Sequence, residues 1–249
     1  MQTILHILIG ALGAVLGSFA GVISERLHTG ESWIQGRSKC NSCARVLSSV
    51  DLIPVLSWVS TRGRCRGCRA SVPYRYAIIE ALLALLFYGG ARLVGFTPEL
   101  PFLLISFFIL AIVVLYDLRH TIVPLNLALL LIATSGIYAW LHAANIHAFG
   151  IAVFTAGIIA SGFAFLHFVS RGRWMGLGDA PIALALSLLA GGSAISGLLF
   201  SFWIGGAFGI IVLVTAPKGH RIGIEVPFVP FLAAGYLLAL FTQWNPFIL

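Results

Sequence analysis

Charged side chains are scarce in this chain of 249 residues. They make up 9% of it, against about 25% in an ordinary soluble domain, whereas 59% of the chain is hydrophobic. This shortage excludes a soluble globular enzyme and places most of the chain in lipid. Lys and Arg outnumber Asp and Glu by 15 to 8, which gives a net charge of +7. In a membrane protein that excess indicates orientation and attraction to anionic lipids, so nucleic acid is not expected as a partner.

The N-terminal segment lacks the basic residues of a secretory signal. No Lys or Arg precedes Arg26, and the apolar run 4–23 is too long for a cleaved signal peptide, so it is expected to remain as a first span. Further apolar runs predict an all-α polytopic membrane protein with about eight transmembrane helices. The later spans are expected at 76–95, 101–119, 122–141, 148–170, 180–196, 197–216 and 227–244.

One polar segment interrupts the apolar pattern. From Arg26 to Arg75 the chain holds all four cysteines, which predicts a small extramembrane domain, 26–75, between a first helix, 1–25, and a seven-helix membrane domain, 76–249. If this domain is cytoplasmic, fourteen of the 15 Lys and Arg residues lie inside and only Arg92 lies outside, as the positive-inside rule requires. The N-terminus is then expected on the outer, periplasmic face.

The four cysteines form two pairs. They are Cys40-x-x-Cys43 and Cys65-x-x-Cys68, with residues 44–64 between them. This spacing is typical of a structural zinc site in which two tight turns supply two thiolates each. A polar domain of about 50 residues has little hydrophobic core, so a metal would stabilise its fold. Disulfides or redox-active dithiols are the alternatives, although a cytosolic location disfavours disulfides. The absence of His after either pair excludes covalent haem attachment.

Two of the few acidic residues lie at comparable ends of predicted spans. Asp117 follows the apolar run 112–116, and Asp179 follows Gly176-Leu177-Gly178. Two carboxyl groups that meet in a poorly hydrated site share one proton, as in acid proteases. The ionised partner then activates water, while the protonated partner polarises a peptide carbonyl and later protonates the leaving amine. Gly176 and Gly178 carry no side chain, which lets an extended substrate backbone approach Asp179.

Other interpretations of these acids stay open at this point. Asp179, which precedes Ala180 and Pro181, is also in a suitable place for a helix N-cap, and Asp117 is in place to mark the point where a helix leaves the membrane. Intramembrane carboxylates also serve proton or cation transport. A zinc-ribbon membrane transporter or assembly scaffold is therefore the rival of a peptidase.

An ordered set of motifs resembles the type IV prepilin peptidases, which are aspartic peptidases of the Gly-x-Gly-Asp class. Similarity extends from Gly17 to about Leu232. The motifs are Gly17-Ser18-Phe19, Ser38-Lys39-Cys40-Asn41-Ser42-Cys43, Asp51-Leu52-Ile53-Pro54-Val55-Leu56-Ser57-Trp58, Arg62-Gly63-Arg64-Cys65-Arg66-Gly67-Cys68, Tyr74-Arg75-Tyr76 leading to Glu80, Asp117 with Pro124, Gly176-Leu177-Gly178-Asp179 and Val226-Pro227-Phe228-Val229-Pro230-Phe231-Leu232.

The resemblance implies a multi-pass endopeptidase of the bacterial inner membrane. Such an enzyme removes the basic leader from type IV prepilins or type II secretion pseudopilins on the cytoplasmic side, between Gly and Phe. By position, Asp117 and Asp179 are the catalytic pair. The implied metal ligands are Cys40, Cys43, Cys65 and Cys68. Members with a tetracysteine domain are commonly bifunctional and methylate the new N-terminal amine with S-adenosylmethionine; a peptidase alone is the alternative.

No motif in the sequence indicates methyl transfer independently of the family resemblance. The glycine-rich turn of a Rossmann methyltransferase is lacking, so S-adenosylmethionine is expected from the resemblance alone. Asp51 and Glu80 are the acidic residues that we expect to bind this cofactor or the new amine. A turn residue and an interfacial charge are their alternative roles.

Overall fold

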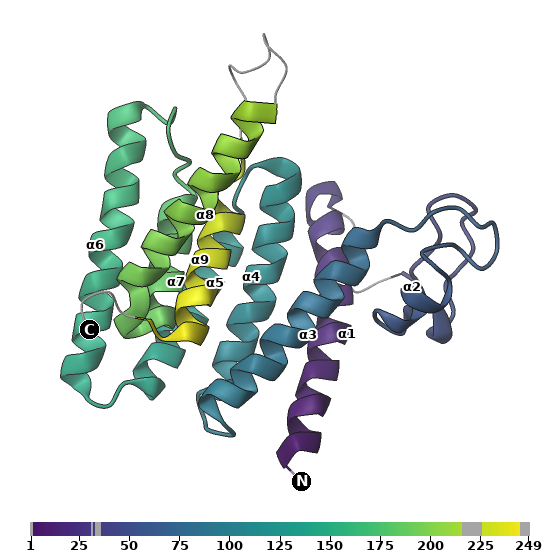
Figure 1. Ribbon diagram of the computed structural model, residues 1–249, viewed down its shortest axis with the longest axis horizontal. Coiled ribbons are helices and arrows are strands. Elements are labelled where there is room, and N and C mark those ends of the chain that lie inside the picture. Colours follow the sequence, from purple (N-terminus) through teal and green to yellow (C-terminus); the bar gives the residue numbers. More distant parts are fainter. Residues whose placement is uncertain (1, 31, 33–35, 216–225, 245–249) are drawn as a thin grey trace. The chain divides into compact units, whose positions relative to one another are not determined.

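The computed structural model describes residues 2–30, 32, 36–215 and 226–244 (Figure 1). Lys218 and Arg221, two of the charges on which the predicted orientation rests, lie outside these residues. The described part of the chain is helical, and its β structure is limited to two isolated bridges. The predicted all-α class is therefore confirmed. The chain divides into two compact units, Met1–Phe96 and Thr97–Leu249.

The first unit is built on two long helices that pack along each other. Its elements are α1 (Gln2–Thr29), η1 (Ser49–Leu52), α2 (Leu56–Ser60) and α3 (Tyr74–Val94). A Cβ added at Gly13 would lie 2.5 Å from the carbonyl oxygen of Leu83, and one added at Gly17 would lie 2.9 Å from the Cα of Glu80. Glycines four residues apart let two helix backbones touch, as they do in membrane helix pairs. Gly17 thereby fixes the position of Glu80 against α1.

Segment 36–73 connects the end of α1 to the start of α3 and forms a small module with almost no hydrophobic core (Figure 1). Among its residues, Cys65 is the one buried apolar side chain. Val50, Leu56 and Val59 are half exposed or more. Apolar burial of this size does not offset the backbone entropy lost on folding, so the module needs another source of stability.

The second unit surrounds a short helix, α7. Its elements are α4 (Leu100–His120), α5 (Leu125–His142), α6 (Ile146–Ser170), α7 (Asp179–Ala190), η2 (Gly191–Ser193), α8 (Ala194–Thr215) and α9 (Val229–Thr242). Ten of the 12 residues of α7 are buried, and the helix packs against α5, α6 and α9. In its interior the Ser187 and Tyr236 hydroxyls share a hydrogen bond of 2.8 Å. This bond ties α7 to α9, whose first turn reaches the acidic site described below.

Helices α8 and α9 approach each other through small residues. A Cβ added at Gly235 would overlap the backbone nitrogen of Ser201, and one added at Gly197 would lie 2.5 Å from the ring of Tyr236. The hydroxyl of Ser201 also donates to the carbonyl oxygen of Leu232 at 3.3 Å. Small residues at both surfaces therefore set the distance between these helices.

Replacing Gly235 with Ala is expected to lower the free energy of unfolding by about 1–3 kcal/mol, because the backbone of α8 cannot move away without repacking α9. The measurement is the thermal midpoint in detergent. Gly157→Ala in α6 is the control, since no atom lies within 4 Å of its added Cβ. That change is expected to leave the midpoint unchanged or slightly raised. Equal midpoints for both variants would contradict the close packing of α8 and α9.

Six segments among the described residues are long and apolar enough to cross a membrane. They are Gln2–Leu27, Tyr74–Val94, Leu100–His120, Leu125–His142, Ile146–Ser170 and Asp179–Thr215. The last contains both α7 and α8, which Gly191 separates with a φ of +52°. Helix α7 is about 18 Å long and α9 about 21 Å, against about 30 Å of hydrocarbon. Each predicted span thus has a helix, but the number eight is not confirmed and stays a prediction.

Candidate active sites

Asp117 lies in the last turn of α4 and is 4% exposed. The helix ends at His120 and is capped by Thr121, which adopts a left-handed conformation and donates its N–H to the carbonyl oxygen of Asp117 at 2.8 Å. The backbone N–H of Val229, at the start of α9, faces this side chain. Its Oδ2 atom is buried and has no hydrogen-bond partner in the described part of the chain. A buried carboxylate oxygen without a hydrogen-bond partner destabilises the fold. We therefore expect this atom to accept a hydrogen bond from a group that binds there during function.

Asp179 is the first residue of α7 and is 7% exposed. Gly178, and not Asp179, occupies the N-cap position, and no side chain caps the helix. The Oδ2 atom of Asp179 instead accepts a hydrogen bond of 3.1 Å from the backbone N–H of Gly176. The N-terminus of α7 also favours a negative charge at this position. The N–H group of Gly176 therefore orients the carboxyl group, and the N-terminus of α7 stabilises its negative charge.

The charges of Asp117 and Asp179 interact electrostatically within the second unit. The chain thus brings the end of α4 to the start of α7, although the two residues are far apart in sequence. Two acids in a mostly buried setting do not both ionise at low cost, so the arrangement favours one shared proton.

The two glycines beside Asp179 have distinct places. Gly176 supplies the N–H that holds Asp179, whereas a Cβ added at Gly178 would lie 2.8 Å from the Cβ of Val123. Gly178 therefore lets the turn pack against the connection between α4 and α5. Next to it lies an apolar pocket of about 350 Å³. Its walls are Val123, Leu125, Ala128, Leu177, Gly178, Ala180 and Pro181.

The four cysteines of the first unit lie together. All are free thiols, and their Sγ atoms lie within 4.8 Å of one another. The Sγ atoms of Cys40 and Cys68 are 3.8 Å apart, close to the separation of about 3.8 Å that tetrahedral geometry gives for zinc–sulfur bonds of about 2.3 Å. The donor set and its geometry therefore fit a closed, four-thiolate metal site.

The two cysteine turns repeat one backbone pattern. In the first, Cys40 N–H donates to Arg45 and Ala44 N–H donates back to Cys40, each at 2.9 Å. In the second, Cys65 N–H donates to Ala70 at 2.9 Å, and Arg69 N–H donates back to Cys65 at 3.0 Å. Each turn is closed by an isolated antiparallel bridge, Lys39 with Val46 and Arg64 with Ser71. The repetition explains how two short peptides present four thiols to one point.

The pKa values of the four thiols are shifted in different directions. Backbone N–H groups, first that of Cys43, lower the pKa of Cys40 to about 6. The N–H of Ala70 also lowers the pKa of Cys68, but the neighbouring thiol of Cys43 and burial outweigh it and raise that pKa to about 11. Crowded thiols cannot all ionise without a cation among them, which again favours a bound metal.

Asp51 joins the two cysteine turns. Its Oδ2 accepts from Arg45 at 2.6 Å, and its Oδ1 lies 3.4 Å from Arg66 of the second turn. The same carboxylate accepts from the backbone N–H of Ser48 at 3.0 Å and from its hydroxyl at 2.8 Å. The Ser48 backbone N–H first, with its hydroxyl and both arginines, holds the pKa of Asp51 below its usual value. Asp51 lines a large pocket, but its carboxylate is engaged by the module itself.

Asp51→Asn is expected to weaken metal retention about 10- to 100-fold, as losses of groups that orient metal ligands commonly do. Competition with a coloured chelator measures this change, and Glu99→Gln in the second unit is the acid-to-amide control. Unchanged metal affinity with lost binding of S-adenosylmethionine would instead make Asp51 a cofactor ligand, as the sequence predicts.

Glu80 supports the other side of the module. Its Oε2 accepts a 2.7 Å hydrogen bond from the backbone N–H of Val55. Val55 has a φ of +61°, which is strained for a β-branched residue, and the carboxylate of α3 holds it there. Glu80 is buried on the helix but lines the same large pocket as Asp51.

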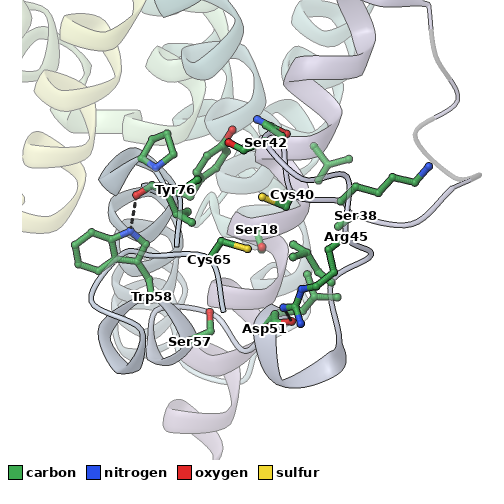
Figure 2. Close-up of a pocket in the computed structure, with 18 of the residues that line it drawn as sticks. Ser18, Ser38, Cys40, Ser42, Arg45, Asp51, Ser57, Trp58, Cys65 and Tyr76 are labelled. Carbon is green, nitrogen blue, oxygen red and sulfur yellow. Dashed lines mark hydrogen bonds and ion pairs between the residues drawn. The ribbon is translucent and has the colours of Figure 1, made fainter. Parts of the chain in front are cut away.

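This pocket of about 820 Å³ lies wholly within the first unit (Figure 2). Trp58 is fixed at its wall by a 3.0 Å hydrogen bond from Nε1 to the carbonyl oxygen of Val72, drawn as a dashed line. The Tyr76 hydroxyl donates to Oε1 of Glu25 at 2.7 Å. Ser18, Cys40 and Cys65 also border the pocket. A cavity large enough for a small molecule thus lies beside the cysteine cluster.

Comparison with known proteins agrees with the sequence motifs. The family model described as the bacterial peptidase A24 N-terminal domain matches residues 11–92. A prepilin leader peptidase/N-methyltransferase of Aeromonas salmonicida is 32% identical over 225 residues, with 84% of this chain and 74% of the relative covered. The chain belongs to the prepilin leader peptidase/N-methyltransferase family. The family predicted from the motifs is thereby confirmed.

Two further relatives of this family carry the same name. The Myxococcus xanthus protein is 32% identical over 221 residues, covering 84% of this chain. The chain spans 64% of the length of that relative. The Bacillus subtilis protein is 28% identical over 232 residues, covering 91% of this chain and 90% of the relative. No solved structure gives a significant match.

Some site groups were missed by sequence reasoning. The Val229 N–H at Asp117, the Tyr76–Glu25 pair and the pocket wall at Trp58 were not predicted as parts of a site. Val229, Tyr76 and Trp58 each lie inside a motif that carries the family resemblance. Those motifs could have pointed to these residues. They do not indicate which atom of each residue takes part in a site.

Proposed function

We propose that the protein is a membrane aspartic endopeptidase that removes the basic leader of type IV prepilins or type II secretion pseudopilins. The observation that carries this proposal is the interacting pair of buried carboxyl groups, Asp117 and Asp179, in a chain whose relatives are named prepilin leader peptidases. Cleavage is proposed at the Gly–Phe bond, on the cytoplasmic side of the bacterial inner membrane. The N-terminus is then periplasmic, and the cysteine module is cytoplasmic.

The proposed reaction uses one proton shared by the two acids. The ionised carboxylate takes a proton from water, which attacks the scissile carbonyl carbon, while the protonated acid hydrogen-bonds the carbonyl oxygen. Breakdown of the tetrahedral intermediate returns a proton to the leaving amine. The N–H group of Gly176 holds the carboxyl group of Asp179 during these steps, and the N–H group of Val229 faces that of Asp117.

The apolar pocket beside Asp179 suits an apolar side chain next to the scissile bond. Its walls present Val123, Leu125 and Leu177 and almost no polar surface. A phenylalanine side chain is expected to enter it, because burial of its ring supplies about 1.5–3 kcal/mol. The apolar part of the substrate is proposed to arrive through the lipid bilayer, since the basic leader is not attracted by a chain of net charge +7.

The four-cysteine cluster is proposed to hold a structural Zn²⁺. Four thiolates leave no open coordination position, so the ion would stabilise the module and take no part in proteolysis. The relatives' name supports a second activity, methylation of the new N-terminal amine. S-adenosylmethionine supplies a methyl group on a cationic sulfur for such a step, and Asp51 and Glu80 line the pocket proposed to receive it. A peptidase without this second activity is the alternative.

The proposed activities are tested with the protein in liposomes that contain a purified prepilin. The expected products are the free leader and a mature pilin with phenylalanine first, and addition of S-adenosylmethionine raises the mass of that pilin by one methyl group. Cleavage that yields a mature pilin with an unmodified N-terminal amine would show that the protein is a peptidase without methyltransferase activity. An intact prepilin, with the cysteine module metal-loaded, would contradict the peptidase and favour the rival transporter or scaffold.

A further inference from the structure

Met175 and Gly176 share one peptide group, and hydrogen bonds hold that group on both of its sides. The N–H of Gly176 donates to Oδ2 of Asp179 at 3.1 Å. The carbonyl oxygen of Met175 lies 2.9 Å from Nδ1 of His167, in the last turn of α6. A peptide group is planar and rigid, so its C=O and its N–H move together. His167 therefore contacts the same rigid unit that orients the carboxyl group of Asp179.

The contact with Met175 determines which nitrogen of His167 carries a proton. A carbonyl oxygen only accepts hydrogen bonds, so Nδ1 must be the donor. The imidazole packs against Gly172, where an added Cβ would lie 3.2 Å from Cε1 of the ring. Gly172 has a φ of +76°, a conformation that favours glycine. The absence of a side chain at Gly172 thus leaves room for the ring of His167.

The loop that follows α6 is joined to the end of this helix by a small number of hydrogen bonds. The N–H of Gly172 donates to the carbonyl oxygen of His167 at 2.8 Å, and the N–H of Trp174 donates to Oγ of Ser170 at 3.2 Å. Trp174 is 70% exposed, so packing of its ring does not hold the loop. Of these bonds, the one from Nδ1 of His167 reaches furthest along the loop, to Met175 beside the turn that holds Asp179.

The bond from His167 also has an electronic effect on the bond to Asp179. Hydrogen bonds that follow one another in a chain polarise each other. Donation to the carbonyl oxygen of Met175 draws electron density from the peptide nitrogen, which makes the N–H of Gly176 a better donor to Asp179. A stronger bond from Gly176 keeps the carboxyl group of Asp179 in one orientation while its proton is transferred in the proposed reaction.

We infer that His167 is a positioning residue for proteolysis, which fixes the peptide group between Met175 and Gly176 and, through it, the carboxyl group of Asp179. The inference rests on the proposed function and adds to it a residue outside the motifs that carry the family resemblance. His167 acts only through the peptide group. Its loss is therefore expected to slow the chemical step and to leave binding of the prepilin unchanged.

His167→Leu and His167→Asn form a matched pair of variants. Both side chains branch at Cγ and are similar in size, but only the Asn amide places an N–H group where Nδ1 of His167 lies. Steady-state cleavage of a prepilin is measured with the full-length protein in nanodiscs. We expect His167→Leu to lower kcat about 10- to 100-fold with KM within about twofold of wild type. His167→Asn is expected to restore kcat to within about threefold of wild type.

Phe165→Leu is the control, because Phe165 lies on the same helix and is 65% exposed. It is expected to change neither kcat nor KM. The tautomer of His167 provides a second measurement that does not depend on the activity of a variant. NMR of protein labelled with nitrogen-15 in its histidines is expected to show a proton on Nδ1 of His167, with the signal assigned by its loss in His167→Asn.

Three results would overturn the inference and leave the proposed peptidase intact. They are a proton on Nε2 of His167 alone, a wild-type kcat in His167→Leu, and equally low kcat values in His167→Leu and His167→Asn. A wild-type protein that does not cleave a prepilin would overturn the proposed function together with the inference.

Discussion

Asp117→Asn and Asp179→Asn are each expected to lower the cleavage rate by at least about 1,000-fold. Asn cannot take a proton from water or give one to the leaving amine, although it is nearly the same size as Asp. Each variant removes one member of a pair that shares a single proton, so either change stops the cycle. The measurement is the single-turnover cleavage rate of a prepilin in liposomes.

The control for this prediction separates chemistry from folding. Both variants are expected to keep the wild-type metal content and binding of S-adenosylmethionine, since the sites proposed for both lie in the first unit. Glu99→Gln, an acid-to-amide change at the start of α4, is expected to cleave normally. Persistent cleavage in either aspartate variant would show that the two acids do not act as a pair.

Removal of the metal is expected to unfold the cysteine module while proteolytic chemistry survives. Binding of a structural zinc contributes about 10–16 kcal/mol in small zinc domains, and segment 36–73 buries only one apolar side chain among its residues. Treatment with a strong chelator, or the substitution Cys65→Ser, should therefore expose this segment to added protease. The pocket walls at Cys40, Cys65 and Asp51 would be lost with it, so methylation should fall below detection.

Limited proteolysis with mass spectrometry reads out the state of the module, and the prepilin assay reads out both activities. Restoring Zn²⁺ should restore protection and methylation in the chelated wild type, but not in Cys65→Ser. A module that stays protected without metal would contradict the structural role of the ion. Loss of cleavage that zinc does not restore would contradict the separation of the two activities.

Apolar runs predicted the helices of the predicted spans well, because each of these helices is rich in apolar residues. Their lengths were less predictable. The break at Gly191 depends on a positive φ, and the early end of α7 depends on packing against α5, α6 and α9. Hydropathy does not locate a break between two apolar helices, so the boundary predicted between residues 196 and 197 lies at Gly191 in the structure.

The clustering of the four cysteines was predictable because its chemistry is local. Each pair of cysteines is placed by the backbone hydrogen bonds of its own turn. The fold then needs only to bring these two turns into contact. The roles of Asp51 and Glu80 were not predictable in the same way. Asp51 bridges Arg45 and Arg66, and Glu80 supports Val55 from a distant helix. Spacing along the chain does not encode which partner engages a carboxylate.

The affinity for a peptide whose Gly–Phe amide is replaced by a hydroxyl-bearing isostere tests the shared-proton site most directly. The hydroxyl takes the place of the attacking water between the carboxyl groups of Asp117 and Asp179. The account predicts binding at least about 100-fold tighter than that of a matched peptide without the hydroxyl, with the difference lost in both Asp→Asn variants. Equal affinity for the two peptides, or a preference that survives in either variant, would contradict a paired aspartate site.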